Sequence, residues 1–400
     1  MKRIDIEELL KELGTIEDKR RQWGNLRHKL TEILFICLCA IMCGMEDIEG
    51  IATFGEVRKK WLRKYIELKN GAPSAATYER VLRMLEPKEV EKFYRSWAKA
   101  LHEESGTSQI SIDGKTICGA GAAQKVHMVS AWAKEEGLCL GQIRTEEKSN
   151  EITAIPELLK LIDVSECVVS IDAMGCQKKI AEAIREKDAD YLLAVKGNQA
   201  ALNEGIREYM ESIEAGREPE AIADRWDSGC EKGHGRIERR IITVCACPEW
   251  KGVTDAWKDI HTLIRYDCIR EQIRQVDEKA DSSSTSSISN TSSISNTSST
   301  SSYTRYYISS IRAVDAKLIG GYLRGHWAIE NQLHWMLDVV FREDSSTVRM
   351  NHAPENLNVL RKIALSLLRS TPTSKRMSTR AKLAKAALCP DFLSLALFGK

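Results

Sequence analysis

The sequence predicts a mixed α/β protein in which a helical N-terminal domain precedes a mixed five-stranded sheet with flanking helices. Three features of its 400 residues support this prediction. Residues 1–105 carry the apolar spacing of helices, residues 109–145 contain short strand-like runs, and residues 150–195 alternate helix-like with strand-like segments. Short runs joined by Gly-containing turns indicate antiparallel strands, whereas alternation of strand and helix indicates parallel pairing.

Composition narrows the class of protein. Hydrophobic residues make up 43% and charged residues 29% of the chain, enough for several packed units. The charged N-terminus argues against a secretion signal, and the longest apolar run, residues 33–45, is shorter than the ~17–25 residues that span a bilayer. The twelve cysteines include no C-x-x-C pair, so we expect reduced core thiols in a cytoplasmic protein.

Residues 1–105 form the predicted N-terminal domain. Amphipathic runs indicate helices near Lys29–Met42, Asp47–Lys64 and Thr77–His102. Because the net charge is only +2, a nucleic acid would have to bind local basic patches. Such patches would suit DNA phosphates, and a solvated helix face is the alternative. They are Lys19–Arg21, Arg27–Lys29, Arg58–Lys60 and Arg63–Lys64.

Residues 106–214 are the first part of the predicted core. Three antiparallel strands are expected first, and β-α-β-α units follow them. The expected strands are residues 109–113, 125–133, 138–145, 167–172 and 190–195, and the expected helices are residues 152–161 and 177–187. This order of elements describes the ribonuclease H-like fold.

Residues 215–312 interrupt the alternation and are predicted to form a β-rich insertion. Runs at 236–247, 261–276 and 304–311 have the composition of strands. Residues 281–302 are almost entirely Ser, Thr and Asn, so we expect a disordered Ser/Thr loop there.

Residues 313–400 are predicted to complete the core with helices at 316–340 and 354–369 and to end in a basic C-terminal tail. Residues 361–400 hold nine Lys or Arg against one acid, Asp391. This local charge could bind a DNA backbone, and a floppy basic tail is the alternative.

Two aspartates end predicted strands of the core. Asp113 follows QISI and precedes Gly114, and Asp172 follows VVSI and precedes Ala173. An Asp at the tip of a buried strand places its carboxylate at the edge where ligands of α/β sheets collect, although a turn also favours Asp. Since the first and fourth strands of this fold are neighbours, the two carboxylates would repel unless a cation lay between them. Mg²⁺ is the expected cation because it prefers oxygen ligands.

A third candidate acid lies in residues 324–349. On a helix His326, Glu330 and His334 share one face, where a Glu is costly unless it is paired or metal-bound. A zinc site made of all three is disfavoured, because the two histidines are two turns, about 12 Å, apart. The other interpretation makes Glu330 a third oxygen ligand, with the histidines and Trp327 supporting it or contacting DNA. A polar helix face packed on another domain is the structural alternative.

Six motifs in order resemble the DDE-type transposases of bacterial insertion sequences, in the group that contains the H-repeat-associated proteins. The motifs are SIDGKTI, VVSIDAMGCQ, YLLAVKGNQ, EKGHGRIERR, YYISSI and RGHWAIENQLHWMLDVVFRED. The resemblance covers about residues 15–370. It implies that Asp113, Asp172 and Glu330 are the catalytic, metal-binding triad and that the β-rich insertion separates the last core strand from the helix of Glu330.

The same resemblance implies a Mg²⁺-dependent endonuclease and DNA strand transferase. Two Mg²⁺ ions about 3.5–4 Å apart, with Mn²⁺ as a substitute, would clamp the scissile phosphate while water and then the freed 3′-hydroxyl attack it. The expected partners are double-stranded DNA, as the element's terminal inverted repeats and as target, and a second copy of the chain in a homodimer on DNA. We therefore expect a cytoplasmic, nucleoid-associated protein.

Further residues are expected to hold the DNA backbone or end bases. They are Lys115, Lys196, Asn198, Gln199, His234, Arg236, Arg324, His326 and Trp327. Related transposases carry Tyr, Arg and Lys at fixed offsets from the Glu, where this chain has Leu323, His326 and Leu337, so Arg324 and His326 are candidates for the phosphate contacts. Two other functions stay open: a catalytically silent DNA-binding relic of a transposase, and a ribonuclease H-like host nuclease.

Overall fold

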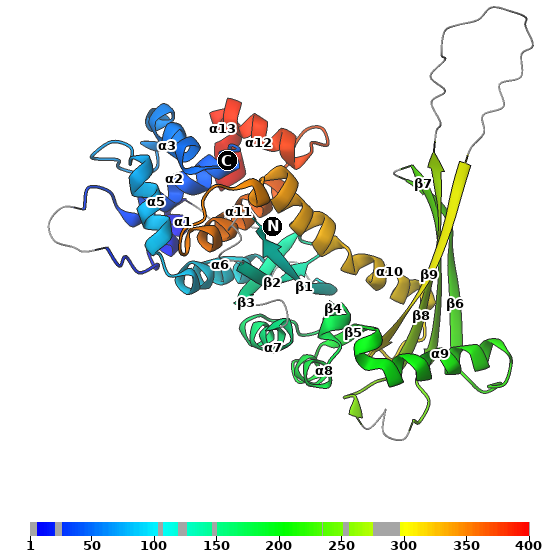
Figure 1. The fold of residues 1–400 in the computed structure, drawn as a ribbon. Coiled ribbons are helices and arrows are strands. Elements are labelled where there is room, and N and C mark those ends of the chain that lie inside the picture. Colours follow the sequence, from blue (N-terminus) through cyan, green and yellow to red (C-terminus); the bar gives the residue numbers. More distant parts are fainter. Residues whose placement is uncertain are drawn as a thin grey trace, which may run out of the picture. The chain divides into compact units, whose positions relative to one another are not determined.

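The structure, a computed structural model, divides into two compact units. It describes residues 6–20, 26–102, 107–118, 126–145, 150–233, 235–250, 256–274 and 297–399. Unit 1 comprises the described parts of Met1–Asp190 and Arg324–Lys400, and unit 2 those of Tyr191–Leu323 (Figure 1). Unit 1 is therefore built from two stretches of chain, one on each side of unit 2 in the sequence.

The sheet of unit 1 has the order β3-β2-β1-β4. β1 (Gln109–Ile117), β2 (Val126–Ala133) and β3 (Leu138–Thr145) are antiparallel neighbours, and β4 (Val168–Ile171) runs parallel to β1. The predicted neighbourhood of the first and fourth strands is confirmed. Asp113 does not end its strand as expected, because the residues after it continue to pair with β2 as far as Ile117.

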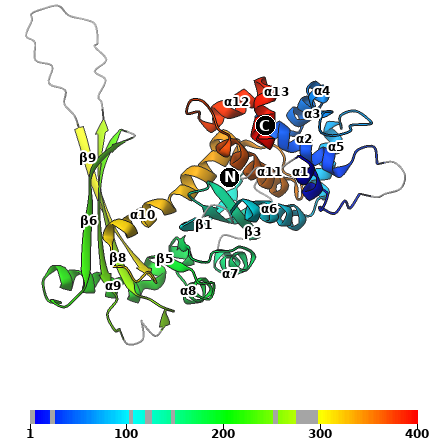
Figure 2. The same cartoon turned by 180° about the vertical axis from the view of Figure 1, so that it is seen from behind.

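Unit 1 also contains eleven α-helices within its described residues (Figure 2). They are α1 (Ile6–Leu13), α2 (Leu30–Met42), α3 (Ile48–Val57), α4 (Lys59–Leu62), α5 (Ala75–Met84), α6 (Pro87–His102), α7 (Glu151–Leu161), α8 (Lys178–Arg185), α11 (Ala353–Ser370), α12 (Thr379–Leu388) and α13 (Pro390–Phe398). Most of the apolar run at residues 33–45 lies in the buried helix α2, as predicted, and the helix ends at Met42. Among the described residues, no helix combines the length and apolarity that crossing a membrane would require. All twelve cysteines are free, and most are buried.

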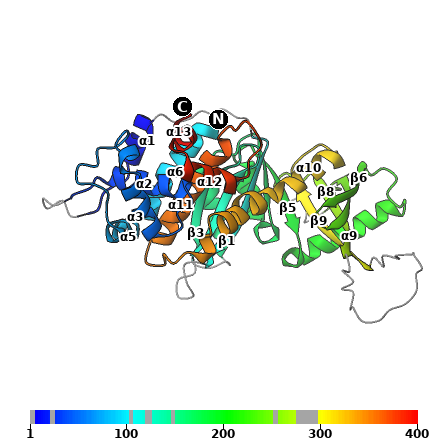
Figure 3. The same cartoon turned by 90° about the horizontal axis from the view of Figure 1, so that it is seen from above.

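The N-terminal helices belong to the same compact unit as the sheet. α11 packs against α2 (Figure 3), and most residues of both helices are buried. The buried amide of Asn356 on α11 donates hydrogen bonds to the carbonyls of Leu82 and Leu85, at the end of α5. The compact units divide the chain at residues 190/191 and 323/324, whereas the sequence predicts boundaries after residues 105, 214 and 312.

The described part of the basic C-terminal stretch is folded, so the alternative of a floppy tail is wrong for it. α13 buries Phe392 and Leu393, and the ammonium of Lys382 on α12 donates to the carbonyls of Leu368 and Thr371 near the end of α11. Arg361 and Lys362 are also buried. The positive charges of this stretch therefore do not all lie on the protein surface.

Unit 2 contains an antiparallel sheet of order β5-β9-β8-β7-β6 with α9 against β8 and β9. The elements are β5 (Asp190–Val195), α9 (Ala200–Glu214), β6 (Ala223–Gly233), β7 (Arg236–Ala246), β8 (Thr262–Arg274), β9 (Thr297–Ser309) and the first part of α10 (Ala316–His326). The β-rich character of this segment is confirmed. The sequence missed β6 and α9.

The predicted Ser/Thr loop is wrong at its C-terminal end. Residues 297–302 form the start of β9 and pair with β8, where Ser302 lies opposite Ile269 and Ser298 opposite Ile273. Backbone hydrogen bonds of the ladder need no apolar side chain, so a Ser/Thr composition did not prevent strand formation here. The rest of the predicted loop, residues 281–296, lies outside the described residues.

Candidate active site

The chain segment that carries Glu330 is helical but is not a single α-helix. After α10, the backbone forms π turns in η6 (Glu330–His334) and η7 (Met336–Val340). The N–H of Trp335 donates to the carbonyl of Glu330, five residues earlier, and the N–H of Phe341 donates likewise to Met336. π turns are rare, and they are frequent at functional sites. The expectation of a long helix over 316–340 is confirmed, while its winding was not foreseen.

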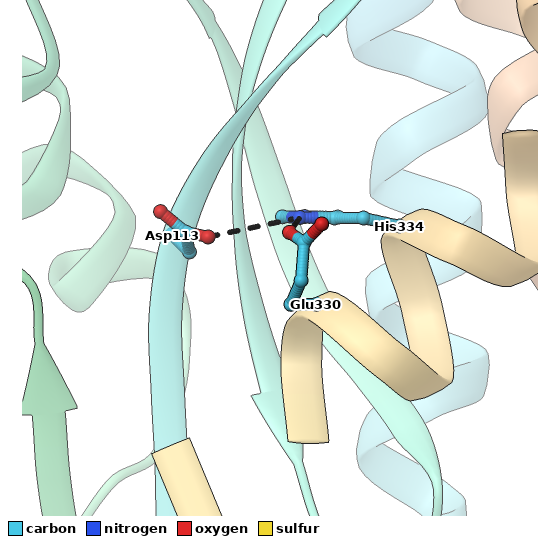
Figure 4. A group of neighbouring side chains, drawn as sticks. All are labelled: Asp113, Glu330 and His334. Atoms are coloured by element: carbon cyan, nitrogen blue, oxygen red, sulfur yellow. Dashed lines mark hydrogen bonds and ion pairs between the residues drawn. The ribbon is translucent and has the colours of Figure 1, made fainter. Parts of the chain in front are cut away.

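Asp113 and Glu330 lie together with His334, although Asp113 and Glu330 are far apart in the sequence. The Nδ1 atom of His334 lies 3.1 Å from Oε2 of Glu330 and 3.7 Å from Oδ2 of Asp113 (Figure 4). One possible ligand atom from each of the three side chains lies within 4.8 Å of the other two. Two carboxylates and an imidazole at such distances form a donor set that fits a divalent cation.

Asp172 lies beside this group without joining it. Because Ile112 on β1 is paired with Ile171 on β4, Asp113 and Asp172 follow neighbouring positions of two parallel strands. The carboxylate of Asp172 accepts a hydrogen bond of 3.0 Å from the N–H of Met174. The set of close ligand atoms contains Asp113, Glu330 and His334, and not Asp172.

The carboxyl groups of the site titrate differently. Burial raises the pKa of Asp113 to about 6, and the charges of Asp172 and Glu151 add to this rise against the opposing effects of His334 and the Gly114 N–H. For Glu330, which is more exposed, the hydrogen bond with His334 holds the pKa below its ordinary value. A cation between the two carboxylates would favour the ionised form of both.

A buried pair of side chains lies behind Asp113. The Nε2 atom of His127 on β2 lies 2.6 Å from Oε1 of Glu151 at the start of α7, and its Nδ1 atom lies 2.9 Å from the hydroxyl of Thr116. A Cβ atom on Gly114 would come within 2.6 Å of this His127 Nε2 atom. Glycine is therefore required next to Asp113, because any side chain would displace the pair.

Lys115 connects β1 to the segment that follows Glu330. Its ammonium lies 2.6 Å from Asp338, 3.3 Å from Glu343 and 3.4 Å from Asp344. Glu343 is fully buried and also pairs with Arg361. Lys115 itself is only 8% exposed, so its charge is used inside the protein and is not presented to a DNA phosphate as the sequence predicted.

The other predicted DNA-contacting residues fall into two groups. Near Glu330, Arg324 and Trp327 are exposed, and His326 Nδ1 lies 3.1 Å from the hydroxyl of Ser170 on β4. The group of close ligand atoms found among the described residues does not include His326, so the zinc site of His326, Glu330 and His334 is not formed. The second group is in unit 2 and comprises Lys196, Asn198, Gln199 and Arg236. His234 lies outside the described residues.

Comparison with known proteins places the chain in a family. A family model described as "Transposase DDE domain" matches residues 104–367, and one described as "DDE_Tnp_1-associated" matches residues 10–98. The chain belongs to the DDE transposases. It is 39% identical to "Putative transposase YncI" of Escherichia coli O157:H7, over 92% of this chain and 88% of that protein.

Further similarities were found for this DDE transposase. It is 34% identical to "H repeat-associated putative transposase YhhI" of Escherichia coli K12, over 99% of both chains. Its group is therefore the one that the six motifs indicated. A solved synaptic complex of the piggyBac transposase with hairpin DNA aligns with a TM-score of 0.42 and 9% identity, covering 98% of this chain and 82% of that one. At this TM-score the likeness carries no conclusion.

Proposed function

We propose that this DDE transposase cuts and joins DNA strands at the ends of an insertion sequence, with Asp113, Asp172 and Glu330 as its catalytic carboxylates. The observation that carries the proposal is the meeting of Asp113 with Glu330 in a chain whose family acts as transposases. Asp172 is included because it follows the strand paired in parallel with β1 and its charge raises the pKa of Asp113.

The same carboxylates would hold two Mg²⁺ ions, or Mn²⁺ in their place. When bound, such ions supply positive charge at the scissile phosphate and acidify a bound water. The residues fit this task, since one possible ligand atom from each of Asp113, Glu330 and His334 lies within 4.8 Å of the other two. His334 holds the carboxylate of Glu330, and the ion pairs of Lys115 fix the following segment against β1.

We infer that the sheet of unit 1 belongs to a ribonuclease H-like core. Three antiparallel strands followed by a fourth strand parallel to the first support this inference. In this view β5 is the fifth strand, residues 215–312 are a β-rich insertion, residues 313–400 complete the core, and residues 1–105 are a helical domain that contributes to DNA binding.

The proposed substrate is double-stranded DNA, as the element's terminal inverted repeats and as target, bound by a homodimer. Arg324, His326 and Trp327 would contact DNA beside Glu330. In unit 2, Lys196 and Asn198 are exposed, as backbone contacts require. Gln199, His234 and Arg236 complete the proposed set.

A cleavage assay on a duplex that carries the element's own end tests the assignment. With Mg²⁺ present, Asp113→Asn, Asp172→Asn and Glu330→Gln should each lower cleavage roughly a hundredfold or more, since a metal site supplies several kcal/mol to the transition state. Binding of the uncut end should remain. The matched control is Glu157→Gln, an exposed acid on α7 paired with Lys160.

The products separate the competing functions. Normal cleavage by any of the three variants would remove that residue from the site. Cleavage without joined strands would favour a host nuclease, and the absence of cleavage by the unaltered protein with Mg²⁺ or Mn²⁺ would favour a silent relic.

A further inference from the structure

We propose that His334 is a metal ligand of this site, so that its donor set is mixed nitrogen and oxygen and prefers Mn²⁺ to Mg²⁺. The proposal rests on the proposed function and deepens it by naming a fourth side chain. His334 Nδ1 lies 3.1 Å from Glu330 and 3.7 Å from Asp113, so one ring nitrogen faces both carboxylates (Figure 4).

The ring of His334 is held in place by burial. The residue is 4% exposed, and its helical neighbours Leu333 and Leu337 are fully buried. Its other ring nitrogen, Nε2, has no hydrogen-bond partner among the described residues. Burying an imidazole next to two carboxylates costs free energy unless their polar atoms have partners. A cation between them would bind Nδ1 of His334 and the carboxylate oxygens that face it.

The backbone is wound in a way that brings His334 to Glu330. Both residues belong to the π turn η6, which closes on the fifth residue. His334 and Glu330 are four residues apart, a spacing that places two side chains on one side of a helical segment. His326, four residues before Glu330, is not drawn into the group and contacts Ser170 instead.

A nitrogen ligand changes which cation the site prefers. Mg²⁺ is a small, hard ion that is usually bound through carboxylates and water, whereas Mn²⁺ is a divalent transition metal that accepts imidazole beside carboxylate ligands. With His334 as a ligand, Mn²⁺ gains more than Mg²⁺ does. Without it, Asp113 and Glu330 would offer oxygen alone.

The test measures metal binding by the full chain without DNA. Electron spin-echo spectroscopy of bound Mn²⁺ should show coupling to an imidazole nitrogen in the unaltered protein. The coupling should disappear in His334→Ala and persist in His326→Ala, the matched control on the same helical segment. Calorimetric titration should show the Kd for Mn²⁺ rising roughly tenfold or more in His334→Ala, with a smaller rise for Mg²⁺.

The outcomes distinguish a failure of the His334 proposal from a failure of the proposed function. Mn²⁺ binding without a nitrogen signal, together with an unchanged Kd in His334→Ala, overturns the role of His334 and leaves the carboxylate site intact. A failure of the unaltered protein to bind Mn²⁺ or Mg²⁺ overturns the metal site itself. If His334→Ala does not fold, His334→Asn, whose amide has no imidazole nitrogen, replaces it in both measurements.

Discussion

The ammonium of Lys115 lies 3.3 Å from the carboxylate of Glu343, a side chain with no solvent exposure. Burial by itself would raise the pKa of Glu343, but Arg361 and Lys115 hold it below its ordinary value. Lys115 is two residues from Asp113 on β1, and Glu343 follows the helical segment of Glu330. The ion pair therefore fixes the two halves of the proposed site relative to each other.

Replacing Lys115 should destabilise the protein strongly. Lys115→Met leaves Asp338, Glu343 and Asp344 without their shared cation, and breaking a buried ion pair costs about 3–5 kcal/mol. Urea unfolding measures the loss. The control Lys160→Met removes an exposed lysine and should change stability by less than about 0.5 kcal/mol. Equal midpoints for the two variants would show that the Lys115 ion pairs contribute little.

Adding one methyl group at Gly114 should disturb both stability and cleavage. The new Cβ of Gly114→Ala would meet the buried His127–Glu151 pair, and overpacking of this kind costs about 1–3 kcal/mol. Because Asp113 precedes Gly114, cleavage should fall as well. In Gly321→Ala the new methyl has open space within α10, so stability should rise by about 0.5–1 kcal/mol. If Gly114→Ala changed neither stability nor cleavage, Gly114 would not lie as close to His127 and Glu151 as the structure shows.

The carboxyl group of Asp113 should make stability depend on pH in the metal-free protein. Its pKa is about 6 in the folded protein against an ordinary 3.8, so the folded state binds the proton more tightly. The resulting stabilisation is complete below pH 3.8 and is lost as pH rises through about 6.

The comparison of Asp113→Asn with the unaltered protein measures this effect. The free energy of unfolding of Asp113→Asn, minus that of the unaltered protein, should increase between about pH 4 and pH 7. The increase should be on the order of 2 kcal/mol, because one pKa unit corresponds to about 1.4 kcal/mol. The measurement is a chelator-treated urea titration at several pH values. Parallel curves for the two proteins would refute the raised pKa.

Two deletions should distinguish the contribution of the Ser/Thr segment to stability from the contribution of β9. Removing residues 282–296 leaves every described residue of β9 in place and should change stability by less than about 1 kcal/mol, because closure entropy depends weakly on loop length. Removing residues 282–301 also deletes the residues that pair with Arg270 to Arg274 on β8, and its melting temperature should be lower. Identical melting temperatures would show that this end of the ladder adds no stability.

Much of the fold was predictable where apolar residues alternate or repeat. The bounds of β3 and β5 agree with the predicted strands, and most of the residues in both strands are buried. β6 was missed, since its residues Ala223–Gly233 are mostly exposed and include two glycines. An exposed strand of this kind forms through backbone pairing with β7, which leaves no apolar pattern in the sequence.

The candidate site was predictable only in part. Motifs singled out Asp113 and Glu330, whose carboxylates do lie near each other. The four-residue spacing also predicted that His334 would share a helix face with Glu330, but it gave no sign that His334 would lie near Asp113, which comes from another element. His127 and Glu151 come from different elements and are paired only by folding, so neither had a local signal.

The division of unit 1 into two stretches of chain sets the order in which a ribosome can build the proposed site. Asp113 and Asp172 are synthesised first, then all of unit 2, and Glu330 and His334 only afterwards. A premature stop codon or a frameshift anywhere before codon 330 therefore yields a protein that lacks the last carboxylate. Nascent and truncated copies that lack Glu330 and His334 therefore cannot assemble the proposed site.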